Sequence, residues 1–125
     1  MKLNNFLVLN AILFVPFGIF MLLAPTVIFP LFGINLDADG VLMARVFGSA
    51  LMNLGLICYL IRNEKPTAIG MKAVLIGNFL FHAFDAISTF IASYSGVMNT
   101  LGWMFTLLHF SLAIGFIYYY LQNNK

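Results

Sequence analysis

Charged residues are scarce in this chain. Asp, Glu, Lys and Arg make up only 8% of its 125 residues, whereas 62% are hydrophobic and 16% are aromatic. A water-soluble domain of this length cannot bury so many apolar side chains, because small domains keep a large surface for their volume. The composition therefore excludes an ordinary soluble domain, and we expect no nucleic acid among the partners of this chain.

Cysteine is scarcer still. Cys58 is the only one, so no disulfide can form within the chain. This excludes the paired-cysteine chemistry of thiol-oxidising quinone reductases of similar size. We interpret Cys58 as a small, polarizable packing residue near the cytoplasmic end of its helix.

The sequence does contain four long apolar runs. They cover residues 5–23, 39–61, 67–92 and 98–121. Each run can cross a hydrocarbon core as a helix, which takes about 20 residues, and each is too long and continuous for a barrel strand. A shorter apolar segment, 26–34, contains Pro30 and Gly33 and is expected to lie at the membrane interface. The chain is therefore predicted to be a single all-α domain, 1–125, forming a multi-pass four-helix bundle in the cell membrane.

The few charges fall unevenly on the two sides of this predicted bundle. Asp37 and Asp39 lie in the first loop, and the third loop carries no charge. Basic residues gather at the termini, in the second loop and at the start of the third run, namely Lys2, Arg62, Lys65, Lys72 and Lys125. Lys and Arg are retained on the cytoplasmic side of membranes. We therefore expect antiparallel helices with both the N- and C-termini cytoplasmic.

Two histidines, His82 and His109, lie near the middle of the third and fourth runs. The loop 94–99 separates these runs, and the two histidines are about equally far from it. In two antiparallel helices both imidazoles would lie at one depth, roughly 18–20 Å from the loop. Ionisable side chains at this depth are costly and usually face the interior of a bundle. They are therefore the leading candidates for a functional site.

Further polar residues are predicted to reach the same zone. We expect Arg45 and Asp85 to form a buried ion pair at the mouth of an outward-facing pocket, because a lone charge at this depth is costly. Asn53 would lie at its floor with the two histidines. The predicted ligand-binding residues are Asn10, Arg45, Asn53, His82, Asp85 and His109. The pocket favours an apolar or amphipathic ligand such as a lipid or a quinone, with Arg45 holding a polar head group.

The same residues leave other interpretations open. A purely structural polar core is one. His82 and His109 could also ligate one haem b iron axially, in a redox component for electron transfer. With Asp85 they form a set suitable in principle for a single zinc or iron ion. No nucleophile is convincingly paired with a base, so we assign no catalytic residue and favour a non-enzymatic role. The apolar surface also suits a homo-oligomer or an accessory subunit of a larger membrane complex.

The stretch Ala44–Leu56 contains an Arg-x-x-Gly step and a later glycine, and the third run contains His82-x-x-Asp85. In these features the chain resembles small four-helix integral membrane proteins of bacteria whose function is not established. The resemblance implies a fold and a membrane location, and it implies no activity. Small multidrug exporters share the length and span count, but they carry an essential carboxylate on the first helix, where this chain has none.

Overall fold

The computed structural model describes residues 1–123, and these residues are almost entirely helical. The elements are α1 (Leu3–Leu23), α2 (Pro25–Ile28), the 3₁₀ helix η1 (Phe29–Phe32), α3 (Ala38–Ile61), α4 (Ile69–Tyr94) and α5 (Gly102–Gln122). Four of them, α1, α3, α4 and α5, are long and apolar enough to cross a membrane. Each corresponds to one of the four apolar runs, so the all-helical class expected from the sequence is confirmed.

The ends of these helices follow local turn chemistry. Asp37 caps α3, because its side chain accepts a hydrogen bond of 2.8 Å from the Gly40 backbone. The fourth apolar run becomes helical at Gly102, four residues later than expected. Its first residues form a turn in which the Asn99 side chain accepts a 2.9 Å hydrogen bond from the Leu101 backbone. An asparagine that bonds to the backbone two residues later competes with helix formation, which explains the difference.

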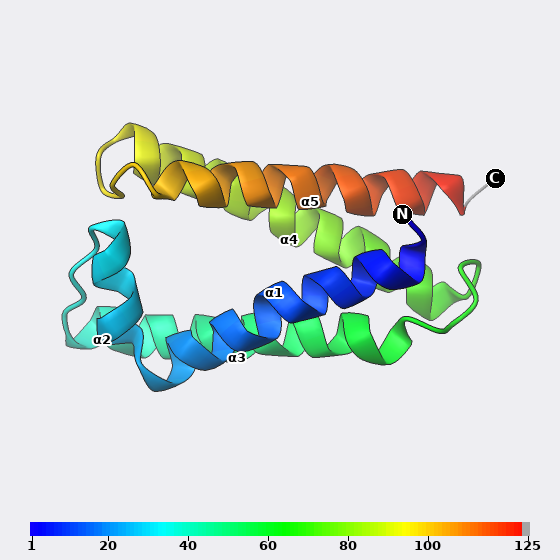
Figure 1. Cartoon of the computed structure of the whole chain (residues 1–125), viewed down its shortest axis with the longest axis horizontal. Helices are drawn as coiled ribbons and strands as arrows, with labels where there is room; N and C mark the ends of the chain where they lie inside the picture. The colour runs from blue at the N-terminus through cyan, green and yellow to red at the C-terminus, as the bar shows by residue number, and fades with distance from the viewer. Residues whose placement is uncertain (124–125) are drawn as a thin grey trace.

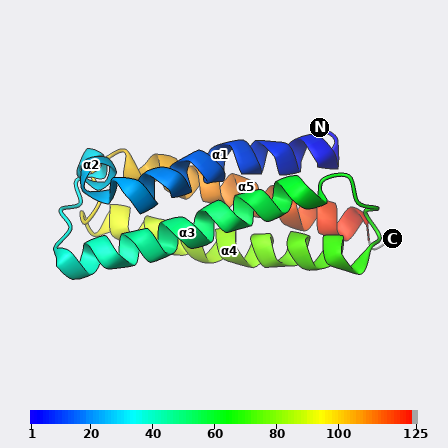
Figure 2. The same ribbon diagram turned by 90° about the horizontal axis from the view of Figure 1, so that it is seen from below.

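The helices form two pairs. α1 packs along α3, and α4 packs along α5, whereas contacts between the pairs are fewer. Figure 1 shows the long helices side by side, with the N-terminus and the end of α5 at the same end of the molecule. At the opposite end, α2 and η1 extend from the α1–α3 pair toward the loop between α4 and α5. In the view of Figure 2, α3 lies in front of the other elements.

Glycines allow α1 and α3 to approach closely. A Cβ atom at Gly18 would lie 2.6 Å from the Gly48 carbonyl oxygen, and one at Gly48 would lie 2.7 Å from the Met21 Cβ. Farther along, a Cβ at Gly55 would lie 3.0 Å from a Val15 methyl group. The pair Ala44 and Gly48, spaced four residues apart, therefore belongs to a helix contact of the small-residue type.

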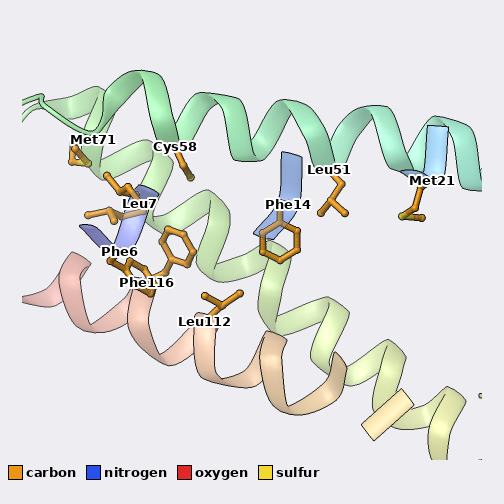
Figure 3. Close-up of a cluster of buried hydrophobic side chains, with 10 residues drawn as sticks. Phe6, Leu7, Phe14, Met21, Leu51, Cys58, Met71, Leu112 and Phe116 are labelled. Carbon is orange, nitrogen blue, oxygen red and sulfur yellow. The ribbon is translucent and has the colours of Figure 1, made fainter. Parts of the chain in front are cut away.

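A core of buried side chains joins the two helix pairs. Phe6 and Phe116 meet there with ring centroids 4.7 Å apart, and Figure 3 shows how side chains from all four long helices converge. The cluster consists of Phe6, Leu7, Phe14, Met21, Leu51, Cys58, Met71, Leu75, Leu112 and Phe116. Outward-facing side chains of the same helices are also large and apolar, as Leu60, Phe84 and Leu107 illustrate. Such surfaces suit contact with lipid.

Candidate functional site

The two histidines meet at the centre of the α4–α5 pair. Nδ1 of His82 lies 3.0 Å from Nδ1 of His109, which is a hydrogen-bonding distance. His82 is 1% exposed and His109 is 6% exposed. This contact confirms the expectation that their equal separation from the intervening loop would bring the two rings to one level.

Asn10 on α1 extends this contact into a chain of polar groups. Its side-chain oxygen lies 3.1 Å from Nε2 of His82, and its amide nitrogen donates to Sγ of Cys58 at 3.4 Å. The chain thus runs from Cys58 on α3 through α1 and α4 to His109 on α5. It links all four long helices and both helix pairs.

The partners of Asn10 determine where the protons lie on the two rings. Because the Asn10 oxygen can only accept, Nε2 of His82 must carry a hydrogen and donate to it. With both rings neutral, Nδ1 of His82 then has a lone pair and accepts from Nδ1–H of His109. If the Asn10 amide were reversed, its nitrogen would face Nε2 of His82, and the hydrogen of His82 would have to move from Nε2 to Nδ1. The amide nitrogen would then also lose its hydrogen bond to Cys58.

Aromatic rings enclose the histidine pair. Phe14 lies with its ring centroid 5.0 Å from that of His82 and 5.7 Å from that of His109. Phe116 stacks on His82 with ring centroids 5.3 Å apart and an interplanar angle of 20°. Phe81 meets His82 edge-on. These apolar walls lower the local dielectric, so a satisfied hydrogen bond is stronger there and an unsatisfied group is more costly.

Asp85 lies at the edge of the pair rather than in the hydrogen-bonded chain. Its carboxylate oxygen Oδ2 is 3.8 Å from Nδ1 of His109, too long for a hydrogen bond, and its side chain is 23% exposed. It is the only approach of a basic side chain to a carboxylate within residues 1–123, and with His109 neutral it is a polar contact rather than an ion pair. The sequence places Asp85 one turn from His82, but the structure brings it to His109 across the helix pair.

Arg45 does not pair with Asp85, so the predicted buried ion pair is wrong. Arg45 is exposed on α3. Phe47, two residues farther along, stacks against Phe81 of α4 with ring centroids 6.1 Å apart. Two residues turn an α-helix by about 200°, so Arg45 points away from the side that faces α4. The position of Arg45 along its helix predicted a depth close to that of Asp85. The two residues do not pair because Arg45 points to the other side of the helix.

Asn53 likewise does not reach the predicted pocket floor. It is exposed on α3, whereas Leu51 and Gly55, two residues away on either side, are buried against α1. The same rotation of about 200° points the Asn53 amide outward. Cys58, by contrast, belongs to the site although the sequence suggested only packing. The sequence feature that could have identified Cys58 is the spacing of small and apolar residues on one side of α3. These buried residues recur every three or four positions and are Ala44, Gly48, Leu51, Gly55 and Cys58.

The histidine pair does not fit an axial haem site. An iron held by one nitrogen of each ring would keep the two nitrogens about 4 Å apart on opposite sides of the porphyrin. Here the facing nitrogens are 3.0 Å apart and bonded to each other. Nor do His82, His109 and Asp85 form a metal site, since residues 1–123 contain no group of three or more His, Cys, Asp or Glu side chains arranged to hold a metal ion.

The open space of the protein lies beside the polar chain rather than within it. A surface hollow of about 450 Å³ runs between α4 and α5; we call it the α4–α5 groove. Its lining is Phe79, Ala83, Ala86, Ile87, Phe90, Thr106, Leu107, Phe110, Ala113, Ile114 and Ile117. None of the six residues predicted to bind a ligand lines this groove.

The groove is nevertheless close to the histidines in the chain. Ala86 follows His82 by one turn, and Ala113 follows His109 by one turn. Both alanines are buried, and both line the groove. The small side chains at these two positions create its depth. No protein-family model matches this chain, and neither a curated protein nor a solved structure is detectably similar to it.

Proposed function

We propose that this protein is a multi-pass cell-membrane protein whose four long helices run antiparallel, with both termini in the cytoplasm. The length and apolar character of these helices support the membrane location. Lys2 and the loop that carries Arg62 and Lys65 lie at one end of the molecule, whereas Asp37 and Asp39 lie at the other. Basic residues favour the cytoplasmic side, which supports this orientation.

We further propose that the protein binds a small apolar or amphipathic ligand in the α4–α5 groove. The observation that carries this proposal is the groove itself, whose volume of about 450 Å³ lies in the range of small-molecule sites. Phe79, Phe90 and Phe110 offer aromatic surface, and Ala83 and Ala86 leave room beside them. Flat ring systems and isoprenoid or acyl tails pack well against such walls.

The polar part of the ligand is expected to be small. Thr106 is the one polar residue of the lining, and its hydroxyl hydrogen is directed to Thr89 at 3.2 Å or to the Gly102 carbonyl at 3.4 Å. The Thr106 oxygen can therefore only accept from a ligand while these bonds persist. This chemistry favours an apolar ring or lipid tail with one small hydroxyl group, such as the quinol form of a quinone, over a charged metabolite.

The histidine pair supports this function from beneath the groove. The bond between His82 and His109 joins α4 to α5 one turn away from Ala86 and Ala113. It thereby fixes the separation of the two helices that form the walls. Preorganised walls reduce the entropy that binding would otherwise cost. In this proposal His82, His109 and Asn10 are positioning residues, and Arg45 and Asn53 take no part in ligand contact.

The test uses Trp103, the single tryptophan of the chain. Its ring centroid lies 5.5 Å from that of Phe90, a wall of the groove, so a quinone bound there would quench its fluorescence. Decylubiquinone is titrated into the protein in mild detergent. We expect the quenching of Trp103 fluorescence to saturate as the single site fills with decylubiquinone. Random collisions within the micelle would instead increase the quenching linearly with quinone concentration.

Two matched variants on α4 test where the quencher binds. Ala83→Leu adds bulk inside the groove and should weaken binding about tenfold or more. Ala73→Leu makes the same change at an exposed position of the same helix outside the groove, and its binding should equal that of the wild type. A doxyl-labelled fatty acid, titrated in parallel, distinguishes a quinone from any apolar tail. Linear quenching by both probes in all three proteins would overturn the proposal.

A further inference from the structure

The outward face of α3 carries a regular row of residues, most of them exposed. Their spacing alternates between four and three residues, and they are Leu42, Val46, Ser49, Asn53, Leu56 and Leu60. This is the a/d spacing of a heptad repeat, with Val46 and Asn53 at a positions. The four aliphatic members are between 43% and 67% exposed. Figure 2 shows α3 in front of the other helices, with nothing covering it.

Asn53 is the unusual member of this row. It lies fifteen residues after the start of the 24-residue α3, at a depth of about 22 Å, well inside a hydrocarbon core. Its amide is exposed and makes no hydrogen bond with any part of the chain within residues 1–123. The Ser49 hydroxyl, by contrast, bonds to the Val46 carbonyl of its own helix at 2.8 Å. An unpaired amide facing lipid at mid-depth is costly, because lipid tails supply neither donors nor acceptors.

We propose that this face of α3 is the interface of a homodimer, with two α3 helices parallel about a two-fold axis normal to the membrane. Asn53 then faces the Asn53 of the second copy. A carboxamide carries both donors and an acceptor, so two identical amides satisfy each other. Polar residues of this kind hold membrane helices together, and an asparagine at an a position also selects the two-stranded parallel register.

The charges on α3 favour a second copy of this chain. Every residue of the row is uncharged, so two copies in register bring no like charges into contact. Arg45 precedes Val46 and is exposed at the flank of the row, outside the predicted contact. The α4–α5 groove is on the other helix pair, so ligand binding and dimer formation use separate surfaces.

Cysteine cross-linking in proteoliposomes tests the geometry. The native Cys58 is fully buried, so an introduced cysteine is the only accessible thiol. Ser49→Cys and Val46→Cys lie in the predicted interface, keep Asn53 intact, and should form disulfide-linked dimers with copper phenanthroline. Leu107→Cys, exposed on α5, serves as the control and should not. Equal yields at all three positions, or none at any, would overturn the proposal and leave lipid or another protein as the cover of this face.

A dilution experiment tests the role of the amide. The dimer dissociation constant is measured by energy transfer between labelled copies as the lipid-to-protein ratio is raised. Asn53→Leu should weaken association about tenfold, the loss expected for one interhelical polar contact. Ser111→Leu replaces an exposed polar residue of α5 and should leave association unchanged. A chain that is monomeric at every dilution, or an Asn53→Leu variant that associates like the wild type, would refute the interface.

Discussion

At the scale of single residues, the buried amides and imidazoles differ in how fully they are bonded. Asn10 uses both ends of its amide, toward His82 and toward Cys58. Asn78 is almost equally buried on α4, but its side chain reaches one other helix only, at the Cys58 thiol of α3; its nitrogen also bonds to the Val74 carbonyl of its own helix, and its oxygen has no partner. Burial alone therefore does not identify the polar residues that join helices; the number of partners on other helices does.

This difference leads to a prediction about Asn10 and Asn78. Asn10→Leu removes the acceptor of the His82 Nε2–H inside an apolar cage, and an unsatisfied buried donor costs about 1–3 kcal/mol. We expect this loss in the free energy of unfolding, measured by denaturant titration in mild detergent. Asn78→Leu removes a buried oxygen that is already unpaired and should change stability by less than about 1 kcal/mol. If both variants lose the same free energy of unfolding, the hydrogen bonds from Asn10 to His82 and Cys58 add no stability beyond that of burying an amide.

At the scale of elements, the α1–α3 contact depends on the absence of side chains. The atoms nearest to an added Cβ at Gly48 include the Gly18 carbonyl at 2.8 Å and the Leu22 backbone nitrogen at 2.9 Å. Backbone atoms cannot move aside as the end of a flexible side chain can. In a membrane, where helices gain little from hydrophobic burial, such close packing is the main source of helix association.

Gly48→Ala is therefore expected to destabilise the protein. The two helices must separate to admit the methyl group, at a cost of about 1–3 kcal/mol or more. Gly77 on α4 provides the matched control, because nothing lies within 4 Å of a Cβ added there. Gly77→Ala should stabilise the helix slightly, by up to about 1 kcal/mol. Thermal unfolding of both variants in the same detergent measures the difference, and similar melting temperatures would contradict the packing argument.

At the scale of the whole molecule, hydrogen bonds tie the helix pairs together at both ends as well as at the centre. At one end the Tyr119 hydroxyl of α5 donates to the Met1 carbonyl, next to the start of α1. At the other, the Asn99 backbone and side-chain nitrogens donate to the carbonyls of Phe32 and Leu31, both at 2.9 Å. The histidine chain lies between them. Two helix pairs with few direct contacts are thus held at three levels.

The proposed orientation predicts which end can be labelled from outside the cell. Asp39→Cys and Lys65→Cys place exposed thiols at opposite ends of the molecule, while the native Cys58 stays buried. A membrane-impermeant maleimide should label Asp39→Cys in intact cells and Lys65→Cys only after permeabilisation, because the basic loop remains in the cytoplasm. The reverse pattern would invert the topology, and labelling of both in intact cells would exclude a single orientation.

The fold class and the meeting of the histidines could be predicted from the sequence, because both depend on distance along the chain. A helix rises about 1.5 Å per residue, so the length of an apolar run indicates a span and the separation of a residue from a loop indicates its depth. Asn10, His82 and His109 were expected at one level, and they are in contact. The same reasoning predicted the depth of Arg45 and Asn53 along α3. Depth does not determine which side of the helix a residue faces, and both residues face outward.

Rotation of each helix about its own axis was decided only by the tertiary structure. In water, an apolar stripe on a helix marks the side that faces the core. In a membrane, lipid and protein interior are both apolar, and helices such as α1 carry apolar residues on every side. Close packing at Gly18 and Gly48 and the bonds of Asn10 determine which side faces inward. These contacts bring Cys58 into the site and turn Arg45 and Asn53 away from it. They depend on how two helices pack against each other, which the sequence of one helix alone does not specify.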